Sequence, residues 1–387
     1  MASGFVRGRA VSEGACVDHS GKQAAVKTSW LFRGAMAALC LLAACGEAPE
    51  GATASSIRRA AQKEGVLRIY ANTSLMAPLI EDFHRQYPEI TVSLTDMNSS
   101  LIAERVTAEA DGGRPEADLV WSSAMDSQIK LINDGYAQPY RSPHRGAMPE
   151  GSVWRDQGFG ITAEPIVFAY NRRLLPPDAV PHSHAELLRL LKARPELFVG
   201  RTTVYDAERS GVALMHLSAD TQIYPDAWRL MEALGDARPR LDTSGKRMMA
   251  QLASGKMALV YNMNQSYGET WLPRHPDVAL VTPSDYHLSV SRVAFITREA
   301  PHPNAARLFL DFLLSREGQG RIADLGIRPV RDDVGDTLRS PPPGARPVRV
   351  GPGLLANLDQ ERRRRLLGRW TLAMRDAPRA PIDPKAP

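Results

Sequence analysis

The sequence predicts an α/β fold in two lobes, because a unit of strand, polar loop and helix recurs along the chain. The first copy spans residues 65–88. Residues 66–70 are β-branched and aromatic over the length of a strand, and the apolar residues of 75–83 fall on one helical face. A second copy spans residues 117–133, and the alternation resumes after residue 166. A chain of 387 residues with 43% hydrophobic and 24% charged residues is long enough for two compact lobes.

Polar residues fill the loop between strand and helix in both copies. Asn72, Thr73 and Ser74 form the first loop, and Ser122 and Ser123 lie in the second. In an open α/β sheet such loops join the carboxyl end of a strand to the amino end of a helix, where free N–H groups and the helix dipole favour ligands that carry oxygen atoms. We therefore expect the two loops to form one side of a binding cleft, although helix capping alone would also explain Ser74.

The remaining elements follow from the same two patterns, alternating apolar residues for strands and an apolar face for helices. Asn98 begins a helix that ends at a Gly-Gly pair, and residues 151–160 are expected to form a loop before the second lobe. The expected strands lie at residues 90–95, 166–170, 202–205, 257–261, 278–281 and 292–297, and the expected helices at residues 55–63, 185–192, 225–234, 242–253 and 304–314.

Residues 1–44 are predicted to be a signal peptide. The apolar run at residues 34–44 follows Lys27 and Arg33 and is shorter than the roughly 20 apolar residues that span a bilayer. Residues 1–26 do not resemble the charged start of such a peptide, so we expect the true start of translation to lie downstream of them.

A lipid anchor is predicted at the end of this segment. Residues 42–45 have the sequence Leu-Ala-Ala-Cys, which resembles a bacterial lipobox and predicts cleavage before Cys45 and lipid attachment to its sulfur. Residues 45–56 would then be a tether to the membrane. Because Cys16 and Cys40 lie upstream of the cleavage point, the mature chain would contain one cysteine and no disulfide. A plain signal peptide followed by an unmodified Cys45 is the alternative.

Sequence motifs for catalysis, nucleotide binding and nucleic-acid binding are either absent from this sequence or lie in a context that does not fit them. Residues 158–163 match a dinucleotide-binding pattern by letter, but no buried strand precedes them and no helix can follow. Neither a nucleophile elbow nor a zinc-protease motif is present. His182 and His184 have no third metal ligand near them in the sequence. The net charge of +5 is scattered along the chain, so we expect no nucleic-acid partner and no enzyme activity.

A third polar strand end follows the strand expected at residues 257–261. It carries Tyr261, Asn264 and Tyr267, and we expect it to face the same cleft as the two loops. Phenolate oxygen suits a hard ferric ion, and aromatic packing explains the two tyrosines equally well.

Four further segments carry a family signal. They are Tyr-Ala-Asn-Thr-Ser at residues 70–74, Ala-Asp-Leu-Val-Trp-Ser-Ser at 117–123, Phe-Ala-Tyr-Asn-Arg at 168–172, and the most specific one at 303–319. Together they resemble the extracellular solute-binding proteins of ABC importers, and within these the ferric-iron-type group. The resemblance spans about residues 55–335.

The resemblance implies a type 2 periplasmic-binding-protein fold. In such a fold each lobe is a mostly parallel sheet flanked by helices, two crossovers form the hinge, and the ligand lies between the lobes. Applied to this chain, it assigns residues 57–165 with 276–335 to lobe 1, 166–275 to lobe 2, and 336–387 to a Pro-rich segment and a C-terminal docking helix.

The resemblance also limits the ligand. Ferric-binding members typically use adjacent tyrosines after the strand that residues 257–261 would match, and here Tyr261 and Tyr267 are not adjacent. The solute is therefore ferric iron or a small oxyanion, carboxylate or organic phosphate, with Arg209 as a two-pronged clamp or, alternatively, paired with a surface acid. The residues expected to contact it are Asn72, Thr73, Ser74, Ser122, Ser123, Arg209, Ser210, Tyr261, Asn264 and Tyr267.

We therefore expect a monomeric, lipid-anchored binding protein of the periplasm or cell envelope. It would need no cofactor, would be attached to the membrane through Cys45, and would hand its solute to an ABC permease in the inner membrane. Closure of the lobes on the solute would be a hinge motion. Two alternatives remain, a sensing module for a membrane signalling partner and an exported enzyme that uses the same cleft.

Overall fold

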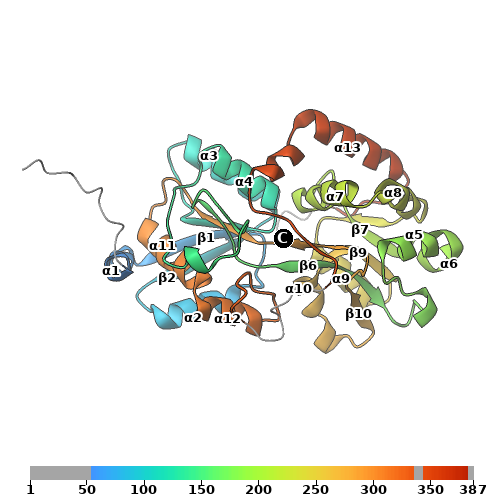
Figure 1. Cartoon of the computed structure of the whole chain (residues 1–387), viewed down its shortest axis with the longest axis horizontal. Helices are drawn as coiled ribbons and strands as arrows, with labels where there is room; N and C mark the ends of the chain where they lie inside the picture. Colours follow the sequence, from blue (N-terminus) through green and yellow to red (C-terminus); the bar gives the residue numbers. More distant parts are fainter. Residues whose placement is uncertain (1–53, 335–342, 382–387) are drawn as a thin grey trace, which may run out of the picture. The chain divides into compact units, whose positions relative to one another are not determined.

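The computed structural model describes residues 54–334 and 343–381, and these form two mixed sheets, each flanked by helices (Figure 1). The signal peptide, Cys45 and most of the tether expected from the sequence lie outside the described residues. The first helix, α1 (Ala54–Glu64), already begins inside the expected tether. None of the described helices combines the length and the apolar composition that crossing a membrane requires.

The first sheet has the strand order β2-β1-β3-β12-β5-β4. Strands β2, β1 and β3 are parallel to one another, whereas β12 runs antiparallel to β3 and β5. The strands are β1 (Val66–Ala71), β2 (Thr91–Asp96), β3 (Leu119–Ser122), β4 (Val153–Trp154), β5 (Gly158–Gly160) and β12 (Val293–Ile296). Its helices are α2 (Ala77–Gln86), α3 (Ser99–Asp111), α4 (Met125–Asn133), η1 (Arg145–Ala147), α11 (Pro303–Leu314) and α12 (Arg316–Asp324).

Alternation of side chains divides the core of this sheet between its two faces. Leu67 and Ile69 of β1 pack on one face, in a cluster with the aromatic rings of α2 and α11, while Tyr70 packs on the other. On the first face the rings of Phe83 and Phe309 meet edge to face, with centroids 5.0 Å apart. The apolar pattern of residues 75–83 therefore buries the helical face that it predicts.

The second sheet has the order β13-β11-β6-β9-β7-β8, with β10 paired to β6. Strand β6 runs antiparallel to β9, β10 and β11, whereas β7 is parallel to both β8 and β9. The strands are β6 (Glu164–Asn171), β7 (Thr202–Tyr205), β8 (Arg240–Asp242), β9 (Leu259–Asn264), β10 (Val278–Val281), β11 (His287–Val290) and β13 (Ala345–Pro347). The helices are η2 (Pro177–Ala179), α5 (His184–Ala193), α6 (Pro195–Phe198), α7 (Gly211–Ile223), α8 (Ala227–Asp236), α9 (Gly245–Ala253), α10 (Gln265–Glu269) and η3 (Leu272–Arg274).

Two local expectations are corrected. Residues 151–160 are not a loop, because β4 and β5 form within them and β5 pairs with β12, a tertiary contact that this Gly-rich stretch does not reveal. The strand expected at residues 257–261 continues to Asn264, since the sheet pairs Met263 and Asn264 with β6 and so satisfies their backbone groups.

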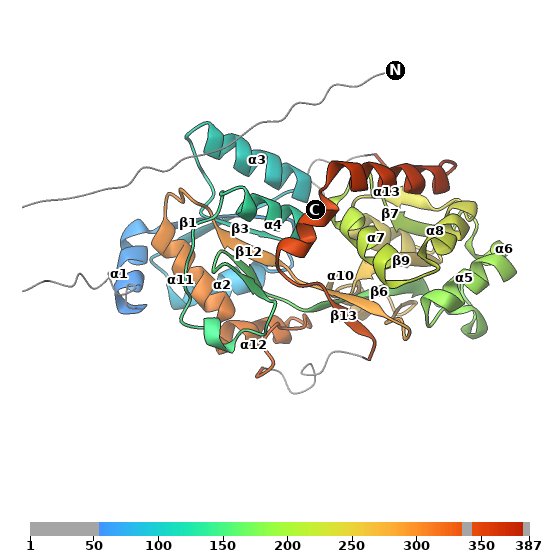
Figure 2. The same ribbon diagram turned by 45° about the horizontal axis from the view of Figure 1, so that its top comes forward.

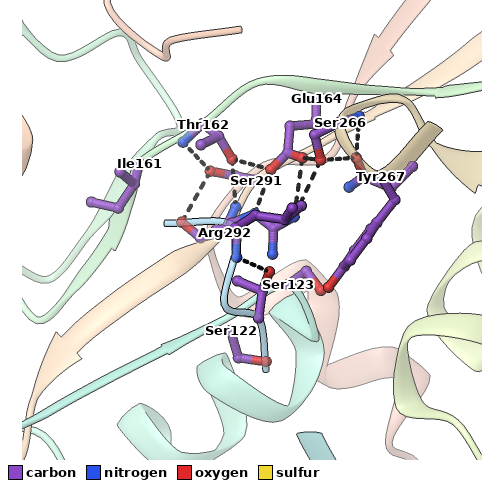
Figure 3. A network of polar contacts seen from close by, with 12 residues as sticks. Ser122, Ser123, Ile161, Thr162, Glu164, Ser266, Tyr267, Ser291 and Arg292 are labelled. Atoms are coloured by element: carbon purple, nitrogen blue, oxygen red, sulfur yellow. Dashed lines mark hydrogen bonds and ion pairs between the residues drawn. The ribbon is translucent and has the colours of Figure 1, made fainter. Parts of the chain in front are cut away.

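The chain crosses between the two sheets at residues 161–163 and at residues 291–292. Glu164 and Arg292 meet at these crossovers, with exposed fractions of 1% and 0%, and their Oε1 and Nε atoms lie 2.8 Å apart. Figure 3 shows this pair with Thr162, whose hydroxyl donates to Glu164, and Ser266 around it. A fully buried ion pair therefore joins the two strands that connect the sheets.

The C-terminal residues return to both halves. The short helix η4 (Pro352–Asn357) packs on α4, and α13 (Gln360–Ala373) packs on α8, beside α7 in both views (Figure 2). Trp370 of α13 is 1% exposed. The helices approach so closely that a Cβ on Gly235 would lie 1.9 Å from the carbonyl oxygen of Ala373, so only glycine fits there.

Candidate functional site

Polar loops of the two sheets meet around one cavity, which we call the cleft cavity. About 540 Å³ of space not filled by protein atoms lies within it, part of which is open to solvent. Its lining residues are Asn72, Asn98, Ser99 and Ser123 from the first sheet, and Tyr205, Ser210, Val212, His216, Thr243, Gly245, Asn264, Tyr267 and Val290 from the second.

Asn72 ties together the two loops on the first-sheet side. Its Nδ2 donates to Ser123 Oγ at 2.8 Å, and its Oδ1 accepts from the backbone N of Ser123 at 3.2 Å. The loops can reach each other because β1 and β3 are parallel neighbours, so their carboxyl ends lie at the same edge of the sheet. The structure thus brings together the two loops that the sequence singles out.

On the second-sheet side of the cleft cavity, most of the polar groups lie at the amino ends of helices. Ser210 caps α7 by accepting from Ala213 N at 3.3 Å, and Ser244, next to Thr243 of the lining, caps α9 in the same way. Together with α3 from the other side, three helices of at least nine residues begin at the cleft cavity. The first turn of each helix leaves backbone N–H groups without a partner inside the helix, and the helix dipole is positive there.

One glycine lets these groups come close together. A Cβ on Gly245, the first residue of α9, would lie 2.5 Å from the hydroxyl of Tyr205. The start of α9 can therefore approach the end of β7 only without a side chain at this position.

Tyr267 reaches across the cavity from one side to the other. Its hydroxyl donates to the backbone oxygen of Asn72 at 3.2 Å. The ring lies 5.5 Å from the guanidinium carbon of Arg292, which connects it to the buried pair at the crossovers (Figure 3). The described conformation therefore has a polar contact across the cleft.

A second, more open cavity adjoins the first at Tyr267, and we call it the outer groove. It encloses about 920 Å³ and carries the exposed cations Lys246 and Arg274. Thr73 and Ser74 lie here and not in the cleft cavity. No carboxylate is among the residues that line either cavity in the part of the chain that the structure describes.

Comparison with known protein families and solved structures shows which proteins this chain is similar to. A sequence profile of bacterial extracellular solute-binding proteins matches residues 78–345. The substrate-binding protein of an ABC transporter from Agrobacterium tumefaciens is 34% identical, with a TM-score of 0.77 over 80% of this chain and 94% of that one. The chain belongs to the extracellular solute-binding proteins. No protein with a curated description matches this solute-binding protein in sequence.

Two more distant structures share the fold of this solute-binding protein. AfuA from Actinobacillus pleuropneumoniae, with fructose 6-phosphate bound, is 19% identical with a TM-score of 0.65 over 80% of this chain and 99% of that one. Iron-bound HitA from Pseudomonas aeruginosa is also 19% identical, with a TM-score of 0.62 over 80% and 99%. The expected α/β fold with two helix-flanked sheets is confirmed, and its sheets are mixed and not mostly parallel.

Three of the ten expected contact residues line neither the cleft cavity nor the outer groove. Tyr261 donates to Asp220 at 3.0 Å, and burial together with that carboxylate raises the pKa of its phenol well above the ordinary value. The hydroxyl of Ser122 accepts from the backbone N of Ala124.

Arg209 is the third of these residues. Its Nε donates to the fully buried carboxylate of Asp206 at 2.5 Å and its Nη1 donates to the backbone oxygen of Ala380. A buried carboxylate requires a cation beside it, so Arg209 pairs with an internal acid and not with a surface acid, and it does not line the cleft cavity.

The remaining lining residues were missed by sequence reasoning, for two different reasons. Asn98 with Ser99, and Thr243 with Gly245, occupy the same strand-to-helix position as the loops that were found, and that pattern could have identified them. His216 lies in the middle of the apolar helix α7, where no pattern distinguishes a lining residue from a core residue. Only the packing of α7 against the two sides of the cleft reveals it.

Proposed function

We propose that this solute-binding protein captures a small, oxygen-rich anion, such as a phosphate, an organic phosphate or a carboxylate, and delivers it to an ABC permease. The observation that carries the proposal is the lining of the cleft cavity, where hydroxyls, amides and three helix amino ends converge without a carboxylate. Such groups donate hydrogen bonds, and they favour negative charge.

The outer groove supports an anion as well. Lys246 and Arg274 are exposed beside it and make the entrance positive. Fixed positive charge at the entrance of a cleft raises the local concentration of anions and their association rate. An anion would thus pass two cations before it reaches the uncharged cleft cavity.

A bare ferric ion fits this lining less well. A hard trivalent cation is held by anionic oxygen ligands, and the cleft cavity offers the phenols of Tyr205 and Tyr267 but no carboxylate. Burial raises the pKa of Tyr205, which opposes formation of a phenolate. Among the described residues, no group of three or more His, Cys, Asp or Glu side chains is placed to hold a metal. Ferric iron therefore stays the alternative solute.

Calorimetric titration of the mature chain tests the proposal. The panel contains inorganic phosphate, sulfate, fructose 6-phosphate, citrate and ferric nitrilotriacetate. We expect at least one of the anions to bind more tightly than the ferric chelate. Binding of ferric iron alone, or of no member of the panel, would overturn the proposal.

Two adjacent serines provide a matched pair of variants for the same titration. Ser123→Ala removes a hydroxyl that lines the cleft cavity and should weaken anion binding about tenfold or more. Ser122→Ala removes a hydroxyl one residue away that does not line it and should leave affinity within about twofold. Equal losses in both variants would contradict the assignment of the site.

The lipobox-like sequence that ends at Cys45 supports a proposal about the location of the protein. We propose that Cys45 is lipidated after cleavage of residues 1–44 and that the protein acts as a monomer at the membrane surface. A Cys45→Ser variant should then appear in the soluble fraction of the cell envelope, whereas the unchanged protein should sediment with the membranes. Retention of the variant in the membranes would rule out this anchor.

A further inference from the structure

His216 is one of several buried side chains in the described part of the chain, Asp126 and His287 among them, with polar atoms that have no hydrogen-bond partner, and it is the one of these three that borders the cleft cavity. Its side chain is 3% exposed, and neither Nδ1 nor Nε2 contacts a donor or acceptor within the described structure. Leaving a buried polar group unpaired costs free energy, so an orphan of this kind calls for a partner that the protein itself does not supply.

The position of His216 shows where that partner would come from. The residue lies on α7, six residues after the cap Ser210, and borders both the cleft cavity and a smaller inner cavity of about 310 Å³. Tyr205 is the other residue that borders both. His216 therefore stands at the inner wall of the space that the solute enters.

The ionisable groups around His216 do not pair with it. On its own helix, Asp220 accepts from the side chains of Tyr261, Asn262 and Tyr286, which occupy both of its oxygens. Strand β7 contributes the phenol of Tyr205, and α10 contributes that of Tyr267. The residues of α8 and α13 that border the inner cavity, Met231 and Trp370, carry no charge. The ring is thus left facing hydroxyls, apolar side chains and the cavity.

We propose, building on the proposed function, that His216 contacts the bound anion and takes up a proton when the anion enters the cleft cavity. The proton comes from solvent and adds to the free ring nitrogen, so that the neutral imidazole becomes an imidazolium and no other bond changes. The ring N–H that faces the cavity donates to an oxygen of the anion, and the positive charge of the ring then lies beside the negative charge of the ligand.

The protonation behaviour of the free protein is consistent with this step. Burial lowers the pKa of His216 to about 4, so the ring is neutral in the empty site at the pH values at which the protein would work. An anion within hydrogen-bond distance favours the charged ring and raises the pKa again. By linkage, the affinity for the anion then increases as the pH falls between the two pKa values, by up to about tenfold for each pH unit.

Parallel titrations of the unchanged chain and of His216→Gln test the proposal. Glutamine keeps an N–H donor but cannot take up a proton. The probe is fructose 6-phosphate or, where it binds more tightly, inorganic phosphate, and the ionisation of the probe itself cancels in the ratio of the two affinities. We expect this ratio to rise about tenfold in favour of histidine from about pH 7.5 to about pH 5.5. A ratio that stays constant over this range overturns the proposal.

His287→Gln is the matched control. His287 is a buried imidazole on β11, 1% exposed, that does not border the cleft cavity. Its replacement should leave the pH dependence of affinity unchanged. Loss of the pH dependence in this variant as well would show a general effect of buried imidazoles and would overturn the assignment to His216.

A spectroscopic measurement covers the case in which His216→Gln does not fold. In the unchanged chain with ¹³C-labelled histidine, one buried resonance should titrate near pH 4 without probe and at about pH 6.5 or above with saturating probe, as the tenfold change of the ratio requires. Absence of such a shift while the probe binds refutes the role of His216 but leaves the proposed function intact. Failure of every anion in the panel to bind refutes both.

Discussion

The two sides of the cleft present their polar groups by different means. On the first-sheet side the groups sit in loops at the ends of parallel strands, where Asn72 and Ser123 bind each other. On the second-sheet side they sit at the beginnings of α7 and α9 and, with His216, inside a helix. On the first side the two loops satisfy each other, and one lining helix, α3, begins there. The second side keeps unpaired donors, so it has more to gain from a ligand.

The largest expected effect on stability comes from breaking the buried ion pair between Glu164 and Arg292, which joins the two crossover strands. Arg292→Met leaves the carboxylate of Glu164 buried without its cation, which should lower the free energy of unfolding by about 3–5 kcal/mol. Urea unfolding measures this loss. The double variant Arg292→Met with Glu164→Gln removes both charges and should recover a large part of the stability. A loss below about 1 kcal/mol in the single variant would show that the pair is not buried as described.

The second prediction concerns the pH dependence of the free energy of unfolding, which two buried titratable groups, one on each side of the cleft, should change in opposite directions. Asp126, in the first turn of α4 directly after the Ser123 loop, is 1% exposed, and burial raises its pKa to about 6. From about pH 4 to about pH 6 the folded chain therefore holds a proton that the unfolded chain has lost, and the free energy of unfolding falls by about 3 kcal/mol as the pH rises through this window.

His216 acts with the opposite sign. Because burial lowers its pKa to about 4, the unfolded chain binds a proton that the folded chain lacks between about pH 6.5 and pH 4. The free energy of unfolding should fall by about 3 kcal/mol as the pH falls through this window. Urea unfolding over a pH series should show Asp126→Asn losing the first dependence and His216→Gln losing the second. Identical profiles in the two variants would contradict the comparison.

The smallest effect separates binding from stability at a helix cap. Ser210 caps α7 at the cleft cavity, and Ser183 caps α5, which does not border it. Replacement of either by alanine should lower the free energy of unfolding by about 1 kcal/mol, since each removes one cap hydrogen bond. Only Ser210→Ala should also weaken anion binding, by several-fold. Calorimetry of the two variants side by side checks this, and equal affinities would remove Ser210 from the site.

The residues of the cleft also show which parts of a site can be predicted from sequence patterns and which cannot. The loops with Asn72 and Ser123 were predicted because each follows a clearly apolar strand and precedes a clearly amphipathic helix, both of which are local signals. Arg209 was expected at the cleft, and the structure places it beside Asp206 instead, because nothing in the sequence pattern reveals that Asp206 is fully buried and needs a cation. Tyr261 was also expected there, and the sequence pattern did not reveal its hydrogen bond to Asp220, because that carboxylate lies on a different element, 41 residues away.

The sequence by itself determined the α/β class, most of the strands and helices, the family resemblance, and the polar loop ends of β1 and β3, because each depends on residues that are neighbours along the chain. Tertiary structure alone decided which polar groups share a cavity. The reason is that burial depends on contacts between distant residues. These contacts bury Asp206 beside Arg209, bring Tyr261 to Asp220, and leave His216 without a partner beside the cleft cavity.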